Sequence, residues 1–191
     1  MNKSILLGIN WEQNSSACLM INGKIISAIS EERFSKRKND EQYPINAINY
    51  LLSSNNIQSA QITKVCFISK YWSPTYSLIR HYSSFTIDAY IFEQEKYRFK
   101  KIYKKKKISL LKIFKHKIDL EQFPGKTFWK NKIKKIENND HTSNKNLKSF
   151  GQKIRTEVVK LHLGLKDNKI TFIDHSFGHI AYAYCSGSIY G

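Results

Sequence analysis

Two histidines near the end of the chain have a spacing that suits metal ligands. His175 and His179 stand four residues apart, and Asp174 comes directly before the first of them. On a helix this spacing puts both imidazoles on one face about one turn apart, so both can bind one metal ion. Two ligands are too few for a divalent ion, and Asp174 adds a third only if the turn allows it. On spacing alone, ordinary packing explains such a pair about equally well.

Two polar segments offer places for an anionic ligand. Glu31–Lys38 is densely charged and follows a predicted strand, where charged groups can cradle a ligand at the strand's end. The loop Asn10–Ser16 carries small polar residues whose N–H groups can hold a phosphate or a hydroxyl acceptor. A solvated charged turn and an ordinary hairpin loop are the simpler interpretations, and each is favoured on these residues alone.

Strands must position these residues, and the N-terminal pattern predicts three of them. Apolar runs of strand length occur in Ser4–Asn10, Ser16–Ile21 and Lys24–Ile29. Asn22 and Gly23 separate the last two runs and form a strong signal for a two-residue hairpin, because both turn positions need a positive φ. We therefore expect three successive antiparallel strands.

The following elements alternate helix and strand. Pro44 suits the first turn of a helix, where its missing N–H costs nothing. Apolar residues then recur at helical spacing: Ile45, Ile48, Leu51 and Leu52. Val65–Ser69 and Lys169–Ile173 are short apolar strands. This order predicts a mixed sheet in an α/β domain, with His175 just after a strand, where open α/β sheets place ligands.

The middle of the chain is harder to interpret. Thr86–Tyr103 predicts a helix with lysines outward and three large residues inward: Ile87, Tyr90 and Ile91. Asn138–Lys148 is polar and is interpreted as a linker. Ser149–Leu163 returns to helical periodicity, and Gly164 suits its C-cap.

The basic charge of the chain is concentrated in one segment. The net charge is +17, and Lys96–Lys135 holds 16 lysines or arginines against two acids, a net +14. We interpret residues 96–148 as a basic insertion-like region within the domain. Its interleaved aromatic residues leave a second hypothesis open, a nucleic-acid-binding protein that contacts phosphates and stacks bases. A charge run is more often a solvated face, so we do not expect nucleic acid as the partner.

Composition limits the class of protein. The 191 residues suffice for one domain with a sizeable core, and 41% of them are hydrophobic. No apolar run is long enough to span a membrane, and the five-residue run near the N-terminus is too short for a signal-peptide core. Cys18, Cys66 and Cys185 form no CxxC pair and fit a reducing compartment, two of them as buried thiols. We expect a cytoplasmic protein.

The order of these motifs resembles the opening of a carbamoyltransferase family, that of nodulation protein U and the cephamycin and tobramycin O-carbamoyltransferases. The family patterns read roughly GI-x-HDSAA, DG-x-I, EERFTR-x-K and FP-x-x-AI. The matching residues here are Leu7-Gly8-Ile9, Asn14-Ser15-Ser16-Ala17, Asn22-Gly23-Lys24-Ile25, Glu31-Glu32-Arg33-Phe34, Lys38 and Tyr43-Pro44-x-x-Ala47-Ile48. Asp174–Tyr184 resembles the family's EHHLAHAASAF, so the resemblance spans almost the whole chain.

The resemblance implies a fold and a reaction. The fold is an α/β, actin-like and Hsp70-like ATPase (ribonuclease H-like) fold, of which residues 1–191 form the N-terminal portion. In the family, a separate C-terminal domain makes carbamoyl-adenylate from carbamoyl phosphate and ATP. The N-terminal domain then passes the carbamoyl group to the hydroxyl of a small-molecule acceptor, which can be a sugar, an aminoglycoside or another hydroxyl compound.

The resemblance also implies roles for individual residues. The family's HxxxH pair binds a divalent metal, usually described as iron, and matches His175 and His179. The lysine that ends EERFTR-x-K contacts carbamoyl-adenylate and matches Lys38. A metal and a lysine would polarise the carbamoyl carbonyl and bear charge that develops in the transition state. The catalytic candidates are Lys38 and Asn14, and the substrate-binding candidates are Lys38, Asn14, Ser15, Glu32 and Arg33.

The sequence departs from the family at three places. The family's His-Asp is Gln13-Asn14 here, and an asparagine cannot accept a proton that the aspartate would take. The second histidine of the family's HH is Ser176. After the position of Gly191 the family continues into further phosphate and metal ligands and the adenylate-forming domain. We therefore expect an N-terminal fragment that is inactive alone, and an inactive actin-like fragment is the remaining alternative.

Overall fold

The computed structural model describes residues 3–81, 83–106, 108–119, 121 and 144–178. It divides into two compact units. The first combines Met1–Trp72 with Arg155–Gly191, and the second is Ser73–Ile154. Among the described residues, the first unit contains the sheet and is mixed α/β, whereas the second is built mainly from helices.

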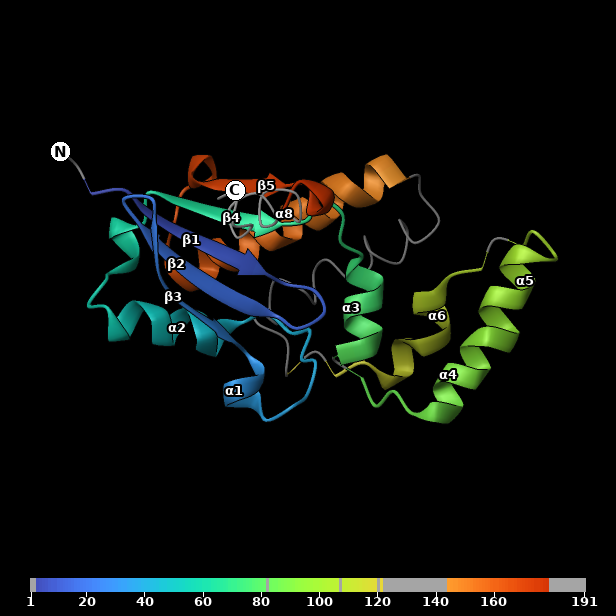
Figure 1. The fold of residues 1–191 in the computed structure, drawn as a ribbon. Helices are drawn as coiled ribbons and strands as arrows, with labels where there is room; N and C mark the ends of the chain where they lie inside the picture. The colour runs from blue at the N-terminus through green and yellow to red at the C-terminus, as the bar shows by residue number, and fades with distance from the viewer. Residues whose placement is uncertain (1–2, 82, 107, 120, 122–143, 179–191) are drawn as a thin grey trace, which may run out of the picture. The chain divides into compact units, whose positions relative to one another are not determined.

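The sheet of the first unit has five strands within the described residues, in the order β3-β2-β1-β4-β5 (Figure 1). The strands are β1 (Ile5–Asn10), β2 (Ser16–Ile21), β3 (Lys24–Ser30), β4 (Lys64–Ile68) and β5 (Ile170–Ile173). The pairs β1–β2 and β2–β3 are antiparallel, and the pairs β1–β4 and β4–β5 are parallel. The predicted three-stranded meander and its extension by two further strands are therefore confirmed.

The hairpin between β2 and β3 has the predicted two-residue turn. Asn22 and Gly23 both have positive φ values, 48° and 80°, which Asn and Gly adopt more readily than other residues. The turn is also tied to the start of β1. The Asn22 N–H donates to the Ser4 carbonyl at 2.9 Å, and the Ser4 N–H donates to Asn22 Oδ1 at 2.9 Å. This anchoring fixes the register of the meander.

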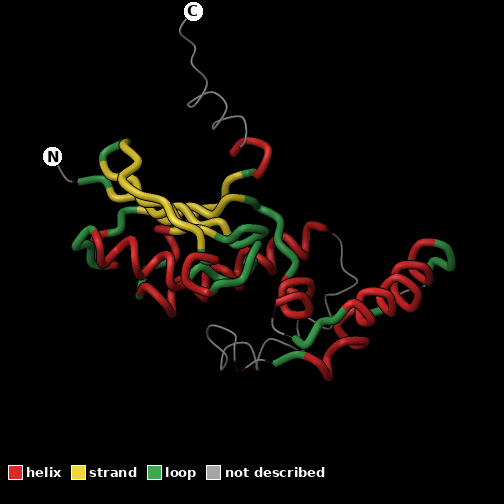
Figure 2. The backbone as a smooth tube through the Cα atoms, turned by 60° about the horizontal axis from the view of Figure 1, so that its bottom comes forward, coloured by secondary structure: helices red, strands yellow, loops and turns green. Residues whose placement is uncertain are grey.

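One face of the sheet is covered by α2 (Ile45–Ser54) and the second half of α8 (Asn144–Leu163), as Figure 2 shows. The helix predicted after Pro44 is thus confirmed. Its inward residues have the predicted spacing, and the buried ones are Ala47, Ile48, Leu51 and Leu52. Alternate residues of β1 point into the same core: Ile5, Leu7 and Ile9. The covered face is the reason for this strict alternation along the strand.

Helix α8 begins earlier than the sequence predicts. Residues 144–148 belong to the helix, so the predicted linker Asn138–Lys148 is wrong over that stretch, and residues 138–143 lie outside the described residues. The helix ends as predicted. Gly164 has φ +66°, and its N–H donates to the Lys160 carbonyl at 2.8 Å. No helix of the described residues is long and apolar enough to cross a membrane.

The second unit packs short helices around a small apolar cluster. Besides the first part of α8, its described α-helices are α3 (Pro74–His81), α4 (Ile87–Glu93), α5 (Phe99–Ile102) and α6 (Leu110–Phe114). A π-helical turn, Gln94–Arg98, joins α4 to α5. The buried members of the cluster are Ile79, Ala89, Tyr97, Leu110 and Phe114. The predicted helix Thr86–Tyr103 therefore exists, with the π turn inside it.

The predicted inward face of that helix is wrong. Ile87, Tyr90 and Ile91 are 80%, 49% and 50% exposed, and the helix buries Ala89, Glu93 and Tyr97 instead. The carboxylate of Glu93 is fully buried because Arg80 and Arg98 bind it, at 2.7 Å and 3.2 Å. An ion pair between helices, which periodicity does not register, selects this face.

The two described cysteines are free thiols in the centre of the sheet. Cys18 on β2 and Cys66 on β4 both lie opposite Gly8 of β1. Both are free, as predicted, but they are half-buried where the sequence predicted buried thiols. Burial raises the pKa of both thiols, which disfavours the reactive thiolate.

Candidate active site

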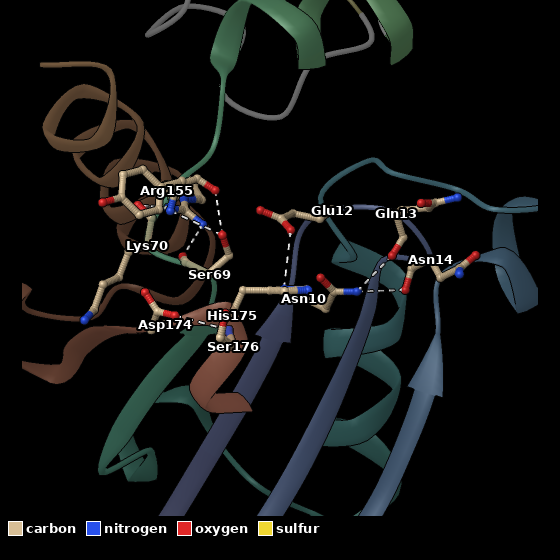
Figure 3. Close-up of polar contacts among 11 residues, drawn as sticks. Asn10, Glu12, Gln13, Asn14, Ser69, Lys70, Arg155, Asp174, His175 and Ser176 are labelled. Carbon is tan, nitrogen blue, oxygen red and sulfur yellow. Dashed lines mark hydrogen bonds and ion pairs between the residues drawn. The ribbon is translucent and has the colours of Figure 1, made fainter. Parts of the chain in front are cut away.

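Three chain segments meet at the carboxyl ends of parallel strands in the first unit. The loop Asn10–Ser16 leaves β1, Ser69–Lys70 leaves β4, and Asp174–His175 leaves β5 (Figure 3). Because these strands are parallel neighbours, their carboxyl ends lie along one edge of the sheet. This is the edge at which open α/β sheets bind ligands.

The first segment is a preformed loop. The side-chain amide of Asn10 donates to the carbonyl oxygens of Gln13 and Asn14, both at 3.1 Å. Trp11 is fully buried, with its ring centroid 5.0 Å from that of Tyr43 and 4.8 Å from that of Trp72. Asn14 has φ 59°, a left-handed conformation that asparagine tolerates. The side chain of Asn14 is exposed to solvent at the rim of the loop.

Ser15 joins this loop to the charged segment Glu31–Asp40. Its N–H donates to the Asp40 carbonyl at 2.7 Å, and its carbonyl accepts from the Glu31 N–H at 2.9 Å. Ser15 is only 1% exposed. Its hydroxyl and Asp40 Oδ2 are buried without a hydrogen-bond partner in the described part of the chain. Buried polar atoms normally have partners, so this corner is suited to a further polar group.

The first glutamate of the charged segment is a helix anchor. Glu31 is 3% exposed. Its Oε1 accepts from Asn46 Nδ2 at 2.6 Å, and its Oε2 accepts from the Ala47 N–H at 2.9 Å. The carboxylate therefore caps the first turn of α2, where the helix dipole favours negative charge. The sequence indicated a charged segment but not this role, although a helix that starts at Pro44 leaves N–H groups that need an acceptor.

The next residues form a compact turn that carries the candidate lysine. Helix α1 (Glu32–Ser35) ends in a left-handed Lys36, and Glu32 Oε2 accepts from the Asn39 N–H at 3.2 Å. Glu32 is partly exposed, whereas Arg33 and Lys38 are exposed. The cap by Glu31 and the link through Ser15 thus attach the turn that bears Lys38 to the loop that bears Asn14.

The third segment brings His175 to the same edge. Residues 175–178 begin a helical turn, whose start is capped by Asp174: the Ser176 N–H donates to Asp174 Oδ1 at 3.1 Å. His175 Nδ1 lies 4.0 Å from Glu12 Oε2. His179 lies outside the described residues. An imidazole beside a carboxylate suits a divalent ion in kind. The number of ligands is too small, however, because no group of three His, Cys, Asp or Glu side chains in the described residues could hold a metal ion.

The middle segment depends on an arginine that the sequence did not single out. Arg155, on α8, is fully buried and donates to the carbonyl oxygens of Ser69 and Lys70, at 3.0 Å and 3.3 Å. Its guanidinium carbon lies 4.7 Å from the ring centroid of Phe172. Burial lowers the pKa of Arg155 to about 10, and the nearby Glu12 carboxylate partly offsets that fall. One feature of the sequence could have indicated that Arg155 is buried: it stands between Ile154 and Val158, on the apolar face of the predicted helix.

Comparisons with known proteins identify the family of the chain. The model of the family described as carbamoyltransferase N-terminus matches residues 5–189. An uncharacterized protein of Synechocystis sp. is 35% identical over 66 residues, which are 34% of this chain and 11% of that protein. The match thus spans only a small part of the relative's length. Because the family model covers nearly every residue from β1 onward, the chain belongs to the carbamoyltransferase family and corresponds to its N-terminal part.

Proposed function

We propose that this chain binds carbamoyl-adenylate and transfers its carbamoyl group to the hydroxyl of a small-molecule acceptor. The observation that carries the proposal is the convergence of the Asn10–Ser16 loop, the Glu31–Asp40 segment and His175 at one sheet edge. These are the three motifs that the family resemblance assigns to the transfer site.

The fold that we propose is the actin-like, ribonuclease H-like one. Three antiparallel strands followed by parallel β4 and β5, in the order β3-β2-β1-β4-β5, support it. In such a sheet the ligand site lies at the carboxyl ends of β1, β4 and β5. The proposal also takes residues 1–191 as one domain interrupted by the basic region 96–148.

Each candidate residue has a chemical task in this proposal. In the transfer, the acceptor oxygen bonds to the carbamoyl carbon, and the bond from that carbon to the phosphate oxygen breaks as AMP leaves. Exposed Lys38 places a cation near the phosphate and the developing oxyanion. The side chain of Asn14 orients the hydroxyl but cannot take its proton, so we assign the proton to the departing phosphate. Ser15, Glu32 and Arg33 line the substrate.

We further propose that His175 and His179 hold a divalent ion, which the resemblance suggests is iron. When bound, the ion would polarise the carbamoyl carbonyl. The chain's own contribution is to present the imidazole of His175 at the end of β5, on a turn that Asp174 caps. Carboxylates from elsewhere must complete the ligand set, so the affinity of this chain alone is weak.

The proposed partners are the small-molecule acceptor and an adenylate-forming domain that consumes carbamoyl phosphate and ATP. Without that domain we expect no turnover from these three substrates. Turnover by the purified chain with ATP, carbamoyl phosphate and an acceptor would contradict this part of the proposal.

Ligand binding tests the central proposal directly. Titration of the chain with a non-hydrolysable carbamoyl-adenylate analogue should give a measurable Kd. Lys38→Ala should weaken binding about tenfold or more, because a charge-assisted contact is worth about 1.5–3 kcal/mol. Lys24→Ala, which removes an exposed lysine of β3 far along the sheet, is the matched control. Equal affinity in both variants would remove Lys38 from the site.

A further inference from the structure

One helical rod of the second unit turns large apolar side chains to solvent. Figure 1 shows α4, the π-helical turn and α5 as one continuous rod, Ile87–Ile102, with α6 along one side. Six apolar or aromatic side chains of the rod and the residue after it are between 48% and 80% exposed: Ile87, Tyr90, Ile91, Phe99, Ile102 and Tyr103. We call this set the apolar face. Single exposed apolar residues are ordinary, but a contiguous set of this size marks an interaction surface.

The buried side of the rod is fixed, so the outward direction of the apolar face is fixed as well. Glu93 is fully buried and is bound by Arg80 and Arg98 at 2.7 Å and 3.2 Å. Ile91 stands two residues from Glu93 and therefore points to the opposite side of the helix. A rotation of the rod that buried Ile91 would break both ion pairs. The protein thus keeps a charge inside and isoleucines outside.

Cations lie beside the apolar face. Residues 87–106 contain seven lysines or arginines against three acids, and one of these acids is the buried Glu93. Lys96, Lys104 and Lys105 are exposed, and Lys104 Nζ lies 5.8 Å from the centroid of the Phe99 ring. Two exposed acids, Asp88 and Glu95, offset only part of this charge. A solvated charged face would explain the lysines alone, but it leaves the apolar side chains between them unexplained.

The combination of charge and shape selects the occupant. A second copy of the chain would bring two basic surfaces together, which like-charge repulsion opposes. Nucleic acid would pair with the lysines and stack bases on Phe99, but three members of the apolar face are aliphatic and provide no stacking platform. An anionic lipid surface satisfies both parts. A helix that lies in the bilayer interface buries its apolar side chains at the acyl boundary, while lysines reach the lipid phosphates.

We propose that the rod Ile87–Ile102 docks this chain on the surface of a bilayer that contains anionic lipids. The apolar face enters the interface, and the flanking lysines and arginines contact the headgroups. The inference concerns the second unit and does not rest on the proposed function, so either one can fail without the other.

Vesicle flotation with the whole chain tests the electrostatic half of the inference. We expect the chain to bind vesicles of phosphatidylcholine with phosphatidylserine and not vesicles of phosphatidylcholine alone. Each cation near an anionic surface contributes about a fivefold change in affinity, so a variant with glutamine at Lys96, Lys104 and Lys105 should bind at least about tenfold more weakly. The matched control places glutamine at three exposed lysines of the first unit, Lys24, Lys64 and Lys166, and should bind as the native chain does. No binding of the native chain to phosphatidylserine vesicles overturns the inference.

A second variant tests insertion of the apolar face. Ile91→Gln with Ile102→Gln removes two exposed isoleucines and keeps every charge, and we expect binding about tenfold weaker or more because apolar burial is lost. Ile25→Gln with Ile26→Gln, at exposed positions of β3, is the control and should keep the native affinity. If the Ile91 and Ile102 variant binds vesicles as the native chain does, the lysines form only a solvated cationic face and the inference is overturned.

The other occupants are distinguished on the same proteins. A dimer in sedimentation that the Ile91 and Ile102 variant dissociates, with no vesicle binding by the native chain, would assign the face to a second copy. Tight binding of duplex DNA at physiological salt, without vesicle binding, would assign the lysines to nucleic acid. Either result overturns the lipid assignment.

Discussion

The guanidinium of Arg155 donates to the carbonyl oxygen of Ser69 at 3.0 Å, although 86 positions separate the two residues. Ser69 has a φ of 91°, and its carbonyl lies just past the end of β4. The same guanidinium also binds the Lys70 carbonyl and packs on Phe172 of β5. One buried side chain thus fixes the turn after β4 beside the turn that carries His175.

Arg155→Met should destabilise the first unit. The variant keeps the apolar bulk but leaves the Ser69 and Lys70 carbonyls without this donor, and we expect a loss of about 2–3 kcal/mol in the free energy of unfolding. Urea denaturation measures the change. Lys153→Met, an exposed position on the same helix, is the control and should stay within about 0.5 kcal/mol of the native value. Equal midpoints for the two variants would show that Arg155 anchors nothing.

Glu31→Ala should loosen the start of α2. The variant removes the acceptor of the Asn46 and Ala47 donors, and loss of such a cap costs about 0.5–2 kcal/mol. Because Glu31 is buried, we expect the upper end of that range. Glu31→Gln retains one acceptor oxygen and should lose less. Amide hydrogen exchange of Asn46 and Ala47 should accelerate in the same order, and unchanged protection in Glu31→Ala would contradict the capping role.

His162 should make stability depend on pH near neutrality. Its Nε2–H donates to Asn49 Oδ1 at 2.8 Å, and its Nδ1 accepts from the Tyr43 hydroxyl at 3.0 Å. Burial lowers the pKa of His162 below its ordinary value of about 6.5, so the folded state binds fewer protons than the unfolded state. Neutral His162 therefore makes its full contribution to the free energy of unfolding at pH values above the ordinary histidine pKa. This contribution is lost as the pH falls through the ordinary pKa toward the lower pKa of His162 in the folded state.

The urea midpoint of the native chain should accordingly drop between about pH 7.5 and pH 5.5, the window around the ordinary histidine pKa. His162→Gln cannot titrate there, so its midpoint should change less over the same interval. A parallel decline in both proteins would place the pH dependence on other groups.

The basic segment should not bind duplex DNA tightly at physiological salt. Lys104, Lys105 and Lys106 are exposed, and isolated runs of exposed lysine are usually solvated. We expect only weak binding that disappears as salt rises, since phosphate contacts release counterions. A fluorescence-anisotropy titration of native chain beside a variant with glutamine at Lys104–Lys107 measures this. Tight binding at physiological salt that is lost in the variant would favour the nucleic-acid hypothesis instead.

Much of the sheet could be predicted from local rules in the sequence. The Asn22-Gly23 turn fixes a hairpin because few residue pairs accept two positive φ values. The apolar spacing after Pro44 fixes α2 because one helix face must meet the sheet. The motif order also predicted the family, since it requires only residue types at set distances along the chain. Lys38, Asn14 and His175 became candidates for the site in this way.

Long-range pairing decided the rest, because periodicity carries no information on the partner that an ionised side chain meets in the fold. Glu31 looked like one charge in a solvated turn, yet it caps a helix fifteen residues later. Glu93 reversed the predicted face of α4, since two arginines offset the cost of burying its charge. Glu12 and Arg155 lie near their partners only because β1, β4, β5 and α8 pack together. The sequence by itself determined which elements form and to which family they belong; the tertiary structure decided which charges are buried, because only packing brings their partners within reach.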